Sequence, residues 1–353
     1  MKSIVVGMSG GVDSSAAAYI LKKAGYQVSG LYVRTFDTEA SLKEAESART
    51  ACEFLEIPFY IKDMRESFEH TVIDRFAAMY ESGLTPNPCL FCNPLIKWKG
   101  LCDFAEEKNA DLIATGHYSA ICEKNGRYAI KRDASSKDQS YVLYGLSQYQ
   151  LSKTVFPLSG YEKEKVREMS REAGIPQADK PDSMEICFIP DNDRMGFLRE
   201  RLKIKDAPGD FVDENGKVLG RHEGIARYTV GQRKGLGIAL GKRIFVKEIR
   251  PMQNQVVLAD DSDVFSDSLF MKNVNFQAAD PKETEIISPF IKIRYGDRGA
   301  GGKITLYRDG IYRIVFDRPV RAVSPGQAAV CYDDQGLILL GGEICSFGEI
   351  KDL

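Results

Sequence analysis

The first half of the chain alternates short apolar runs with longer amphipathic stretches. Residues 3–7 (SIVVG), 28–33 (VSGLYV) and 58–61 (PFYI) have the composition of buried strands, while residues 13–24 and 39–56 have the periodicity of helices. Two later stretches, DLIATGHY (111–118) and EKEKVREMSREAG (162–174), predict a further strand and a further helix. This βαβαβ order predicts a parallel sheet with helices on both faces, whose ligands bind beyond the carboxyl ends of the strands.

Beyond about residue 200 the pattern changes to short alternating runs separated by turns, as in GDFVDENGKVLG (209–220). The turns recur roughly every 8 to 12 residues, a spacing typical of all-β modules. We therefore expect an α/β fold class in three parts. These are a catalytic parallel-sheet domain over 1–200, a central β-rich domain over 201–270 and a C-terminal β-barrel domain over 271–353.

The composition is that of a soluble globular protein, with 43% hydrophobic and 28% charged residues. No apolar run reaches the roughly 18 to 20 residues of a membrane span. The N-terminal MKS continues directly into an apolar strand with no presequence, so we expect a cytoplasmic protein without a membrane partner. The net charge of −2 does not favour a polyanionic partner, but a balanced total can hide a local basic face.

Eight cysteines in 353 residues are too sparse for a disulfide framework. Two of them form a CxxC pair in TPNPCLFCN (85–93), a turn-rich stretch with prolines. Without a secretion signal such a pair is typical of a metal site or a catalytic site. The spacing alone also fits zinc or a redox pair, although zinc usually has a fourth protein ligand and none is obvious nearby.

The loop between the first strand and the first helix has the residues of a phosphate site. Its glycines let the backbone approach an anion, its serines offer hydroxyl donors, and the helix N-terminus behind it favours negative charge. It lacks the Lys of a Walker A loop, and a merely capped turn is the alternative interpretation. We expect phosphate contacts from the segment GMSGGVDS, which is Gly7, Met8, Ser9, Gly10, Gly11, Val12, Asp13 and Ser14.

The full SGGVDSS motif resembles the PP-loop of the ATP pyrophosphatase superfamily. The resemblance implies that ATP is split between its α- and β-phosphates and that AMP is transferred to an oxygen of the substrate. It also implies that Asp13 faces Mg²⁺ and pyrophosphate, and that Val33, just after the second strand, and Gly116 complete the ATP site.

The remaining motifs resemble those of the tRNA-uridine 2-sulfurtransferases and occur in the same order. They are TPNPCLFCN, GHY, KDQSYVL (137–143), KPDSMEICFI (180–189), YTVGQRKGLGI (228–238), RYGDRG (294–299) and RAVSPGQAAVCY (321–332). The resemblance covers nearly the whole chain. It implies ATP-dependent 2-thiolation of the wobble uridine of tRNA by adenylation of the base C2 oxygen, with release of AMP and pyrophosphate. The implied partners are tRNA and a sulfur donor, either a persulfide carrier protein or sulfide.

The resemblance also assigns roles to three cysteines. Cys92 matches the nucleophile, and Cys187 matches a cysteine that accepts sulfur as a persulfide. Many members have Asp where this chain has Cys89, and three thiolates can bind a [4Fe-4S] cluster that leaves one iron open. We therefore favour a cluster held by Cys89, Cys92 and Cys187, and the alternative is a persulfide relay in which Cys89 takes no part.

The tRNA contacts implied by the resemblance come from five places in the chain. A Lys–Asp surface pair, a structural His and a cross-strand Arg–Tyr pair are the ordinary alternatives for such residues, and a basic glycine-rich loop at 231–243 is a further candidate RNA contact. Two other functions stay open. One is a PP-loop amide-forming synthetase, and the other is an RNA-binding or iron–sulfur carrier protein with a degenerate ATP site. The implied tRNA-binding residues are Asn87, Pro88, Cys89, His117, Lys137, Asp138, Gln139, Arg294, Tyr295 and Gln327.

Overall fold

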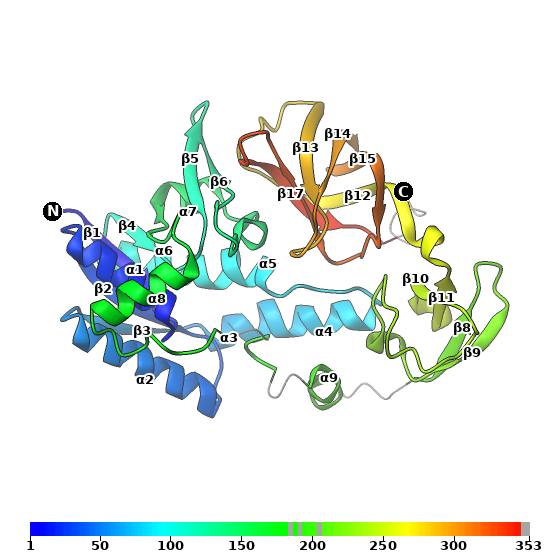
Figure 1. The fold of residues 1–353 in the computed structure, drawn as a ribbon, viewed down its shortest axis with the longest axis horizontal. Coiled ribbons are helices and arrows are strands. Elements are labelled where there is room, and N and C mark those ends of the chain that lie inside the picture. Colours follow the sequence, from blue (N-terminus) through cyan, green and yellow to red (C-terminus); the bar gives the residue numbers. More distant parts are fainter. Residues whose placement is uncertain (183–185, 190–192, 203–206, 347–353) are drawn as a thin grey trace.

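The computed structural model describes residues 1–182, 186–189, 193–202 and 207–346. Residues 183–185 of the KPDSMEICFI motif and the last seven residues of the predicted C-terminal domain, 347–353, lie outside the described residues. Figure 1 shows an α/β part at the N-terminus, a small β-sheet part and a β-barrel. Among the described residues, no helix is long and apolar enough to span a membrane.

The N-terminal part is built on a parallel sheet of strand order β3-β2-β1-β4-β7. Ile4 and Val6 of β1 face one apolar cluster together with α1 and α2, while Val5 faces the cluster that contains α6. The sheet is therefore covered on both faces, as predicted. The elements of the β-α-β series are β1 (Ser3–Gly7), α1 (Val12–Lys23), β2 (Gln27–Arg34), α2 (Glu39–Phe54), β3 (Phe59–Asp63), β4 (Leu112–Ala114) and β7 (Thr154–Val155).

A helical segment that the hydrophobic pattern did not reveal lies between β3 and β4. Pro94 has no N–H to donate and its ring crowds the carbonyl of the preceding turn, so an α-helix cannot pass through it unchanged. The chain widens there into a π turn, in which the Trp98 N–H donates to the Asn93 carbonyl. The segment consists of α3 (Arg65–Phe68), η1 (Glu69–Ile73), α4 (Asp74–Glu81), α5 (Cys89–Cys92), η2 (Asn93–Lys97) and α6 (Trp98–Glu107).

Further strands and helices complete the first part. Ser147 begins α7 with a capping box, because its hydroxyl accepts from the Gln150 N–H while the Gln150 side chain accepts from the Ser147 N–H. The elements are β5 (Ala120–Lys124), β6 (Arg127–Lys131), η3 (Ser140–Leu143), α7 (Gln148–Lys153), α8 (Lys163–Glu172) and α9 (Arg194–Leu202).

Two β-rich parts follow, and the second is a closed barrel of order β12-β15-β14-β13-β16-β17. The predicted fold class is thus confirmed. The central sheet, of order β10-β11-β8-β9, contains β8 (Gly209–Val212), β9 (Val218–His222), β10 (Phe245–Arg250) and β11 (Gln255–Ala259), with the short turns η5 (Ile225–Arg227), η6 (Pro251–Gln253) and η7 (Asp261–Val264). The barrel strands are β12 (Phe265–Phe276), β13 (Glu285–Lys292), β14 (Ala300–Arg308), β15 (Ile311–Arg321), β16 (Ala328–Tyr332) and β17 (Ile338–Ile344).

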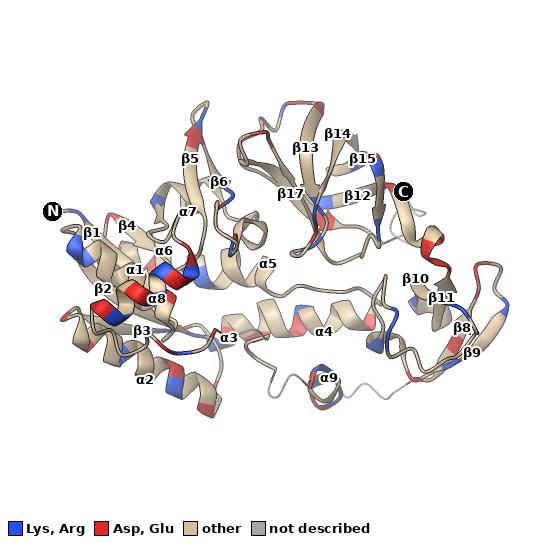
Figure 2. Ribbon diagram, viewed as in Figure 1, with Lys and Arg blue, Asp and Glu red and all other residues tan. Residues whose placement is uncertain are grey.

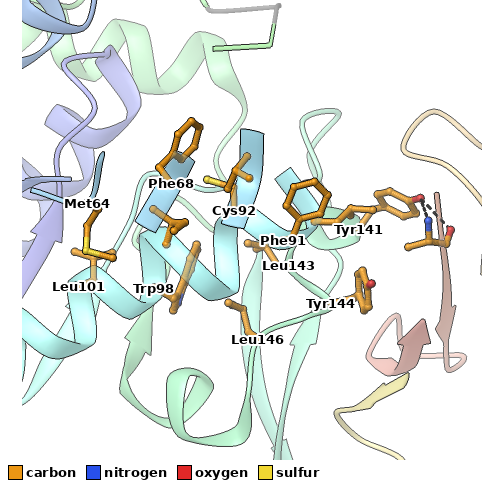
Figure 3. Close-up of a cluster of buried hydrophobic side chains, with 14 of the residues drawn as sticks. Met64, Phe68, Phe91, Cys92, Trp98, Leu101, Tyr141, Leu143, Tyr144 and Leu146 are labelled. Carbon is orange, nitrogen blue, oxygen red and sulfur yellow. Dashed lines mark hydrogen bonds between the residues drawn. The ribbon is translucent and has the colours of Figure 1, made fainter. Parts of the chain in front are cut away.

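The barrel is packed against the first part by a shared apolar cluster that includes Trp98, Tyr141 and Tyr332, all fully buried. Figure 3 shows Tyr141 reaching toward the barrel, where its hydroxyl donates to the Ala328 carbonyl at 2.9 Å. Arg75 of α4 also pairs with Glu343 of β17 at 2.9 Å. Because the polar groups that cross this boundary are hydrogen-bonded, the barrel holds a defined place beside α5.

Candidate active site

The predicted phosphate loop lies between β1 and α1, and side chains from other parts of the chain donate hydrogen bonds to it. Gly10 has φ of 72°, a left-handed conformation that glycine adopts without strain. Its carbonyl accepts from the Ser47 hydroxyl at 2.9 Å and from Lys180 Nζ at 2.8 Å. The hydroxyls of Ser14 and Ser15 donate to the Gly11 carbonyl, so they support the turn itself. The loop leaves the first N–H groups of α1 as the donors for an anion.

Gly116 lies against this loop because β4 is the neighbour of β1 in the sheet. A Cβ added at Gly116 would meet the Asp13 carbonyl carbon and the Ser14 nitrogen, each at 2.7 Å. The point where the strand order turns from β2 to β4 is where open α/β sheets bind their ligands. Val33 lies inside β2, not after it as expected, and packs its side chain on Gly100, so only its backbone is free to contact a base.

Asp13 is engaged by protein groups in this structure. Both of its carboxylate oxygens accept from Lys163 Nζ, at 2.7 and 2.8 Å, and one also accepts from the Tyr118 hydroxyl at 2.7 Å. The expected Mg²⁺ ligand is therefore the partner of a buried ammonium group. As arranged here, the carboxylate does not fit a metal ion, and we derive no step through Mg²⁺.

Lys163 joins Asp13 to a second carboxylate, that of Asp182, at 2.8 Å. Only 5% of the Lys163 side chain is exposed, and Asp182 also receives Arg167 at 2.8 Å and Lys137 at 3.3 Å. Burial alone would raise the pKa of Asp182, but the hydrogen bonds and charges of Lys163 and Lys137 hold it below its ordinary value. This cluster could not be predicted from the sequence, because its members lie far apart along the chain.

The CxxC pair lies in a short helix and not in a turn-rich loop. Cys89 begins α5 and is exposed, whereas Cys92 ends α5 and is buried. In the π turn that follows, residues five apart in the sequence lie one above the other on the helix. Lys97 therefore lies on the same side of the helix as Cys92. Burial would lower the pKa of the Lys97 ammonium group, but the negative charge that Cys92, Cys89 and Cys187 carry when ionised, together with the charge of Glu44, holds it above its ordinary value.

Both predicted sulfur-handling cysteines are thiols in this structure. Burial raises the pKa of Cys92 to about 12, with Lys97 acting in the opposite direction. Cys187 has exposed surface, yet desolvation by the surrounding protein raises its pKa to about 11, again with Lys97 acting in the opposite direction. Among the other cysteines, Cys52, Cys102, Cys331 and Cys345 are buried and Cys122 is half-buried.

The predicted iron–sulfur cluster receives no support from the arrangement of its expected ligands. Within the described residues, which include Cys89, Cys92 and Cys187, no three His, Cys, Asp or Glu side chains form a group that could hold a metal ion. The three thiols influence one another electrostatically without such an arrangement. The cluster therefore stays a prediction, and no step is routed through it.

Several side chains predicted to bind tRNA are bonded to their own chain. The Asp138 carboxylate accepts from the N–H groups of Asp133 and Ser140, and the Gln139 side chain accepts from the Tyr118 N–H at 3.0 Å. The Gln327 amide donates to the Thr85 carbonyl at 2.7 Å, beside a cavity of about 260 Å³ between α5 and the barrel. The polar ends of these residues bond to the protein's own backbone in this structure, and contact with RNA stays a prediction for them.

Other predicted tRNA contacts converge on the start of α5. The Asn87 side chain accepts from the Cys89 N–H at 3.1 Å, and Pro88 immediately precedes the helix. Tyr295, which is 45% exposed, comes from the turn after β13 with Arg294 and donates its hydroxyl to the Asp138 carbonyl at 3.1 Å. Cys89 also contributes to the raised pKa of Tyr295, after burial and Asp138. The barrel thus supplies an exposed aromatic ring near the cysteine helix, suited to stacking on an unpaired base.

Positively and negatively charged residues are intermixed along the elements of the molecule. Figure 2 shows Lys and Arg interspersed with Asp and Glu along α2 and α8. The glycine-rich segment 231–243 is a loop, as expected, and Lys242 in it pairs with Asp260 at 2.7 Å. A basic RNA-binding face is therefore not evident from charge in this view.

Three family models match the chain in succession. They are a tRNA methyl transferase HUP domain over residues 2–191, a tRNA methyl transferase PRC-barrel domain over 195–260 and an aminomethyltransferase β-barrel domain over 266–344. The tRNA-specific 2-thiouridylase MnmA of Lachnoclostridium phytofermentans is 46% identical over 357 residues, covering 97% of this chain and 99% of the relative. The chain belongs to the tRNA-specific 2-thiouridylase family. The member from Clostridium acetobutylicum is likewise 46% identical, over 354 residues and the same shares of both chains.

Membership of the 2-thiouridylase family confirms the resemblance drawn from the motifs. Solved structures with lower sequence identity are similar to parts of the chain. The U34-tRNA thiolase NcsA from Methanococcus maripaludis, solved with its [4Fe-4S] cluster, is 19% identical with a TM-score of 0.36 and covers 58% of this chain and 64% of its own. A 4-thiouridine synthetase–RNA complex with bound ATP is 18% identical with a TM-score of 0.35, and the match covers 51% of this chain and 43% of the synthetase chain. At this level of likeness neither the cluster nor the RNA is transferred to the present protein.

We expect the alkylation rates of Cys92 and Cys187 in the free protein to keep rising with pH up to at least about pH 10. Only the thiolate reacts, and with pKa values of about 12 and about 11 its fraction grows about tenfold per pH unit over this range. Iodoacetamide labelling followed by peptide mass spectrometry measures both rates, with urea-unfolded protein as the control. A plateau near pH 8 in the folded protein would contradict the burial of these thiols.

We expect His117 to remain neutral in the folded protein well below pH 6. Desolvation, assisted by the charge of Lys97, lowers its pKa to about 3, and its Nδ1 lies 2.8 Å from the Thr115 hydroxyl. Since an unfolded His gains its proton near pH 6.5, acid should favour unfolding between these two values. The ring proton resonances, assigned by their loss in His117→Gln, should not move between pH 7.5 and 4.5. A titration midpoint near 6.5 would show that the ring is solvated.

Proposed function

We propose that this protein catalyses the ATP-dependent 2-thiolation of the wobble uridine of tRNA, as the names of its relatives suggest. One observation carries the proposal. Glu44 lies against the phosphate loop, where its carbonyl would be 2.3 Å from a Cβ on Gly10, and its charge acts on both Cys187 and Lys97. This neighbourhood supports a single site that holds both the nucleotide loop and the predicted sulfur-handling cysteines.

The first chemical step is adenylation of the base. The C2 oxygen of the uridine attacks the α-phosphorus of ATP, the bond to the β-phosphate oxygen breaks, and pyrophosphate leaves. The N-terminus of α1 and the N–H groups of the loop bind the phosphates, and the absence of a side chain at Gly116 lets the end of β4 approach the loop backbone closely. ATP enters with Mg²⁺ in this proposal, and no residue is assigned to the metal.

The second step transfers sulfur. A donor leaves a persulfide on Cys187, and its terminal sulfur attacks C2 of the adenylated base, so that AMP departs with the former C2 oxygen. The Cys92 thiolate then attacks the Cys187 sulfur, which releases 2-thiouridine and leaves a Cys92–Cys187 disulfide for reduction by an external thiol. Lys97 supports both thiolates, because it is the cation whose charge opposes the raised pKa values of Cys92 and Cys187.

An amide-forming synthetase has no use for a pair of thiols facing its nucleotide loop, and a carrier with a degenerate ATP site has no reason to retain the braced SGGVDSS loop. The description of two matching models as methyl transferase domains does not alter the proposal, because the near full-length relatives are named thiouridylases.

The test is anaerobic incubation of the protein with unmodified tRNA, ATP, Mg²⁺ and either a persulfide donor or sulfide. We expect the persulfide donor, and not sulfide alone, to yield 2-thiouridine in the RNA, with AMP and pyrophosphate in equal amounts. Absence of AMP would leave only a binding role. Metal-free protein should work with the persulfide donor, and Cys89→Ser should retain most of the activity. Product from iron- and sulfide-reconstituted protein alone, lost in Cys89→Ser, would replace the persulfide relay by the cluster.

A further inference from the structure

A short segment ahead of Cys187 is fixed to α8 along its whole length. We call residues 177–182 the stem. The Arg167 guanidinium donates hydrogen bonds to two of its carbonyls, those of Ala178 and Lys180, each at 2.9 Å. The same guanidinium donates to the Asp182 carboxylate at 2.8 Å. Three bonds from one planar group leave the stem little freedom to move independently of α8.

The stem is also bonded to the nucleotide loop. Lys180 Nζ donates to the Gly10 carbonyl at 2.8 Å, and the Gln177 amide donates to the Ser47 carbonyl at 2.9 Å. The Ser47 hydroxyl in turn donates to the Gly10 carbonyl. The left-handed glycine of the phosphate loop is thus held by two side chains, one of which comes from the stem.

A second connection runs through charge. Asp182 at the end of the stem shares the buried Lys163 ammonium with Asp13 of the nucleotide loop, at 2.8 and 2.7 Å. The stem and the loop are therefore expected to respond to the same ligand, because an incoming triphosphate competes with Asp13 and Asp182 for Lys163.

We infer that Lys180 and Asp182 are positioning residues that tie Cys187 to the nucleotide loop, so that ATP in the loop sets where the Cys187 sulfur lies. The charge of Glu44, whose carbonyl lies against Gly10 of the loop, acts on both Lys180 and Cys187, so these two residues share one neighbour beside the nucleotide loop. The inference rests on the proposed function only for the role of Cys187. The coupling itself needs neither tRNA nor turnover, so it can fail or succeed independently of thiolation.

The test measures the alkylation rate of Cys187 in the full chain by iodoacetamide labelling and peptide mass spectrometry. It compares protein alone with protein saturated by α,β-methylene-ATP and Mg²⁺, a nucleotide that cannot be split at the reacting bond. In the parent protein we expect the nucleotide to change the Cys187 rate at least about fivefold, the lower end of ordinary coupling between sites. The rate of the distant, half-buried Cys122 in β5 serves as the internal reference.

Lys180→Met and Asp182→Asn should reduce this nucleotide effect to less than about twofold at saturating nucleotide. Asp179→Asn is the matched control, because Asp179 lies in the same stem but is 78% exposed and pairs outward with Arg171. It should keep the full effect. If Asp182→Asn no longer binds nucleotide, Lys180→Met carries the test, since it removes one bond to a carbonyl. A parent protein without response, or both variants with the parent's response, would overturn the inference.

Discussion

Serine in place of Cys187 should lower the rate of tRNA thiolation by at least about a thousandfold while leaving ATP binding unchanged. A hydroxyl cannot carry a persulfide. The other two thiols of the predicted site, Cys89 and Cys92, lie in α5 and not after the stem that is bonded to the nucleotide loop, so we do not expect them to replace Cys187. Nucleoside analysis of the RNA measures the product, and binding of α,β-methylene-ATP reports on the loop.

The matched control for this substitution is Cys122→Ser, which removes a half-buried thiol from β5 without touching the site. It should thiolate tRNA at the parent rate. Activity within about tenfold of the parent in Cys187→Ser would show that sulfur reaches the base by another route.

Alanine in place of Gly116 should lower kcat/KM for ATP by about a hundredfold or more, because displacements near 1 Å at a reacting centre have effects of this size. The added Cβ would lie 2.7 Å from two backbone atoms of the nucleotide loop, which has no flexible side chain to yield there. Strain of this kind also commonly lowers the free energy of unfolding by roughly 1 to 3 kcal/mol.

Gly296→Ala is the control, because a Cβ at Gly296 meets nothing within 4 Å and the residue lies in the barrel. Its affinity for α,β-methylene-ATP should equal that of the parent protein. Isothermal titration calorimetry compares the two variants directly. Parent-like affinity and kcat/KM in Gly116→Ala would mean that the β4 end does not approach the nucleotide loop as closely as the structure indicates.

The fold was predictable where local patterns decide it. The apolar runs of β1, β2 and β3 alternate with helices at the spacing of a parallel sheet, and turn signals mark the β-rich half. The stretch from Arg65 to Glu107 was not predictable in this way. Its prolines and Asn residues resemble a turn, but a π turn at Pro94 and the Asn93 amide bonded to the Val142 carbonyl keep it helical.

The nucleotide loop was found from sequence because all of its residues are neighbours in the chain. The partner of Asp13 was not found, because Lys163 lies 150 residues away and nothing in its helix distinguishes it from a surface lysine. The same limit applied to Lys97, whose relation to three thiols depends on the π turn. Residues that act through long-range pairing carry no local signal, whereas motif residues do.

The most direct test of the proposed chemistry uses tRNA whose wobble uridine carries ¹⁸O at C2. In a single turnover with ATP and a persulfide donor, adenylation of the C2 oxygen followed by sulfur attack predicts that the label leaves in AMP, one labelled AMP for each 2-thiouridine formed. Mass spectrometry of the released nucleotide measures it. Unlabelled AMP accompanying 2-thiouridine would contradict adenylation of the base and with it the central step of the mechanism.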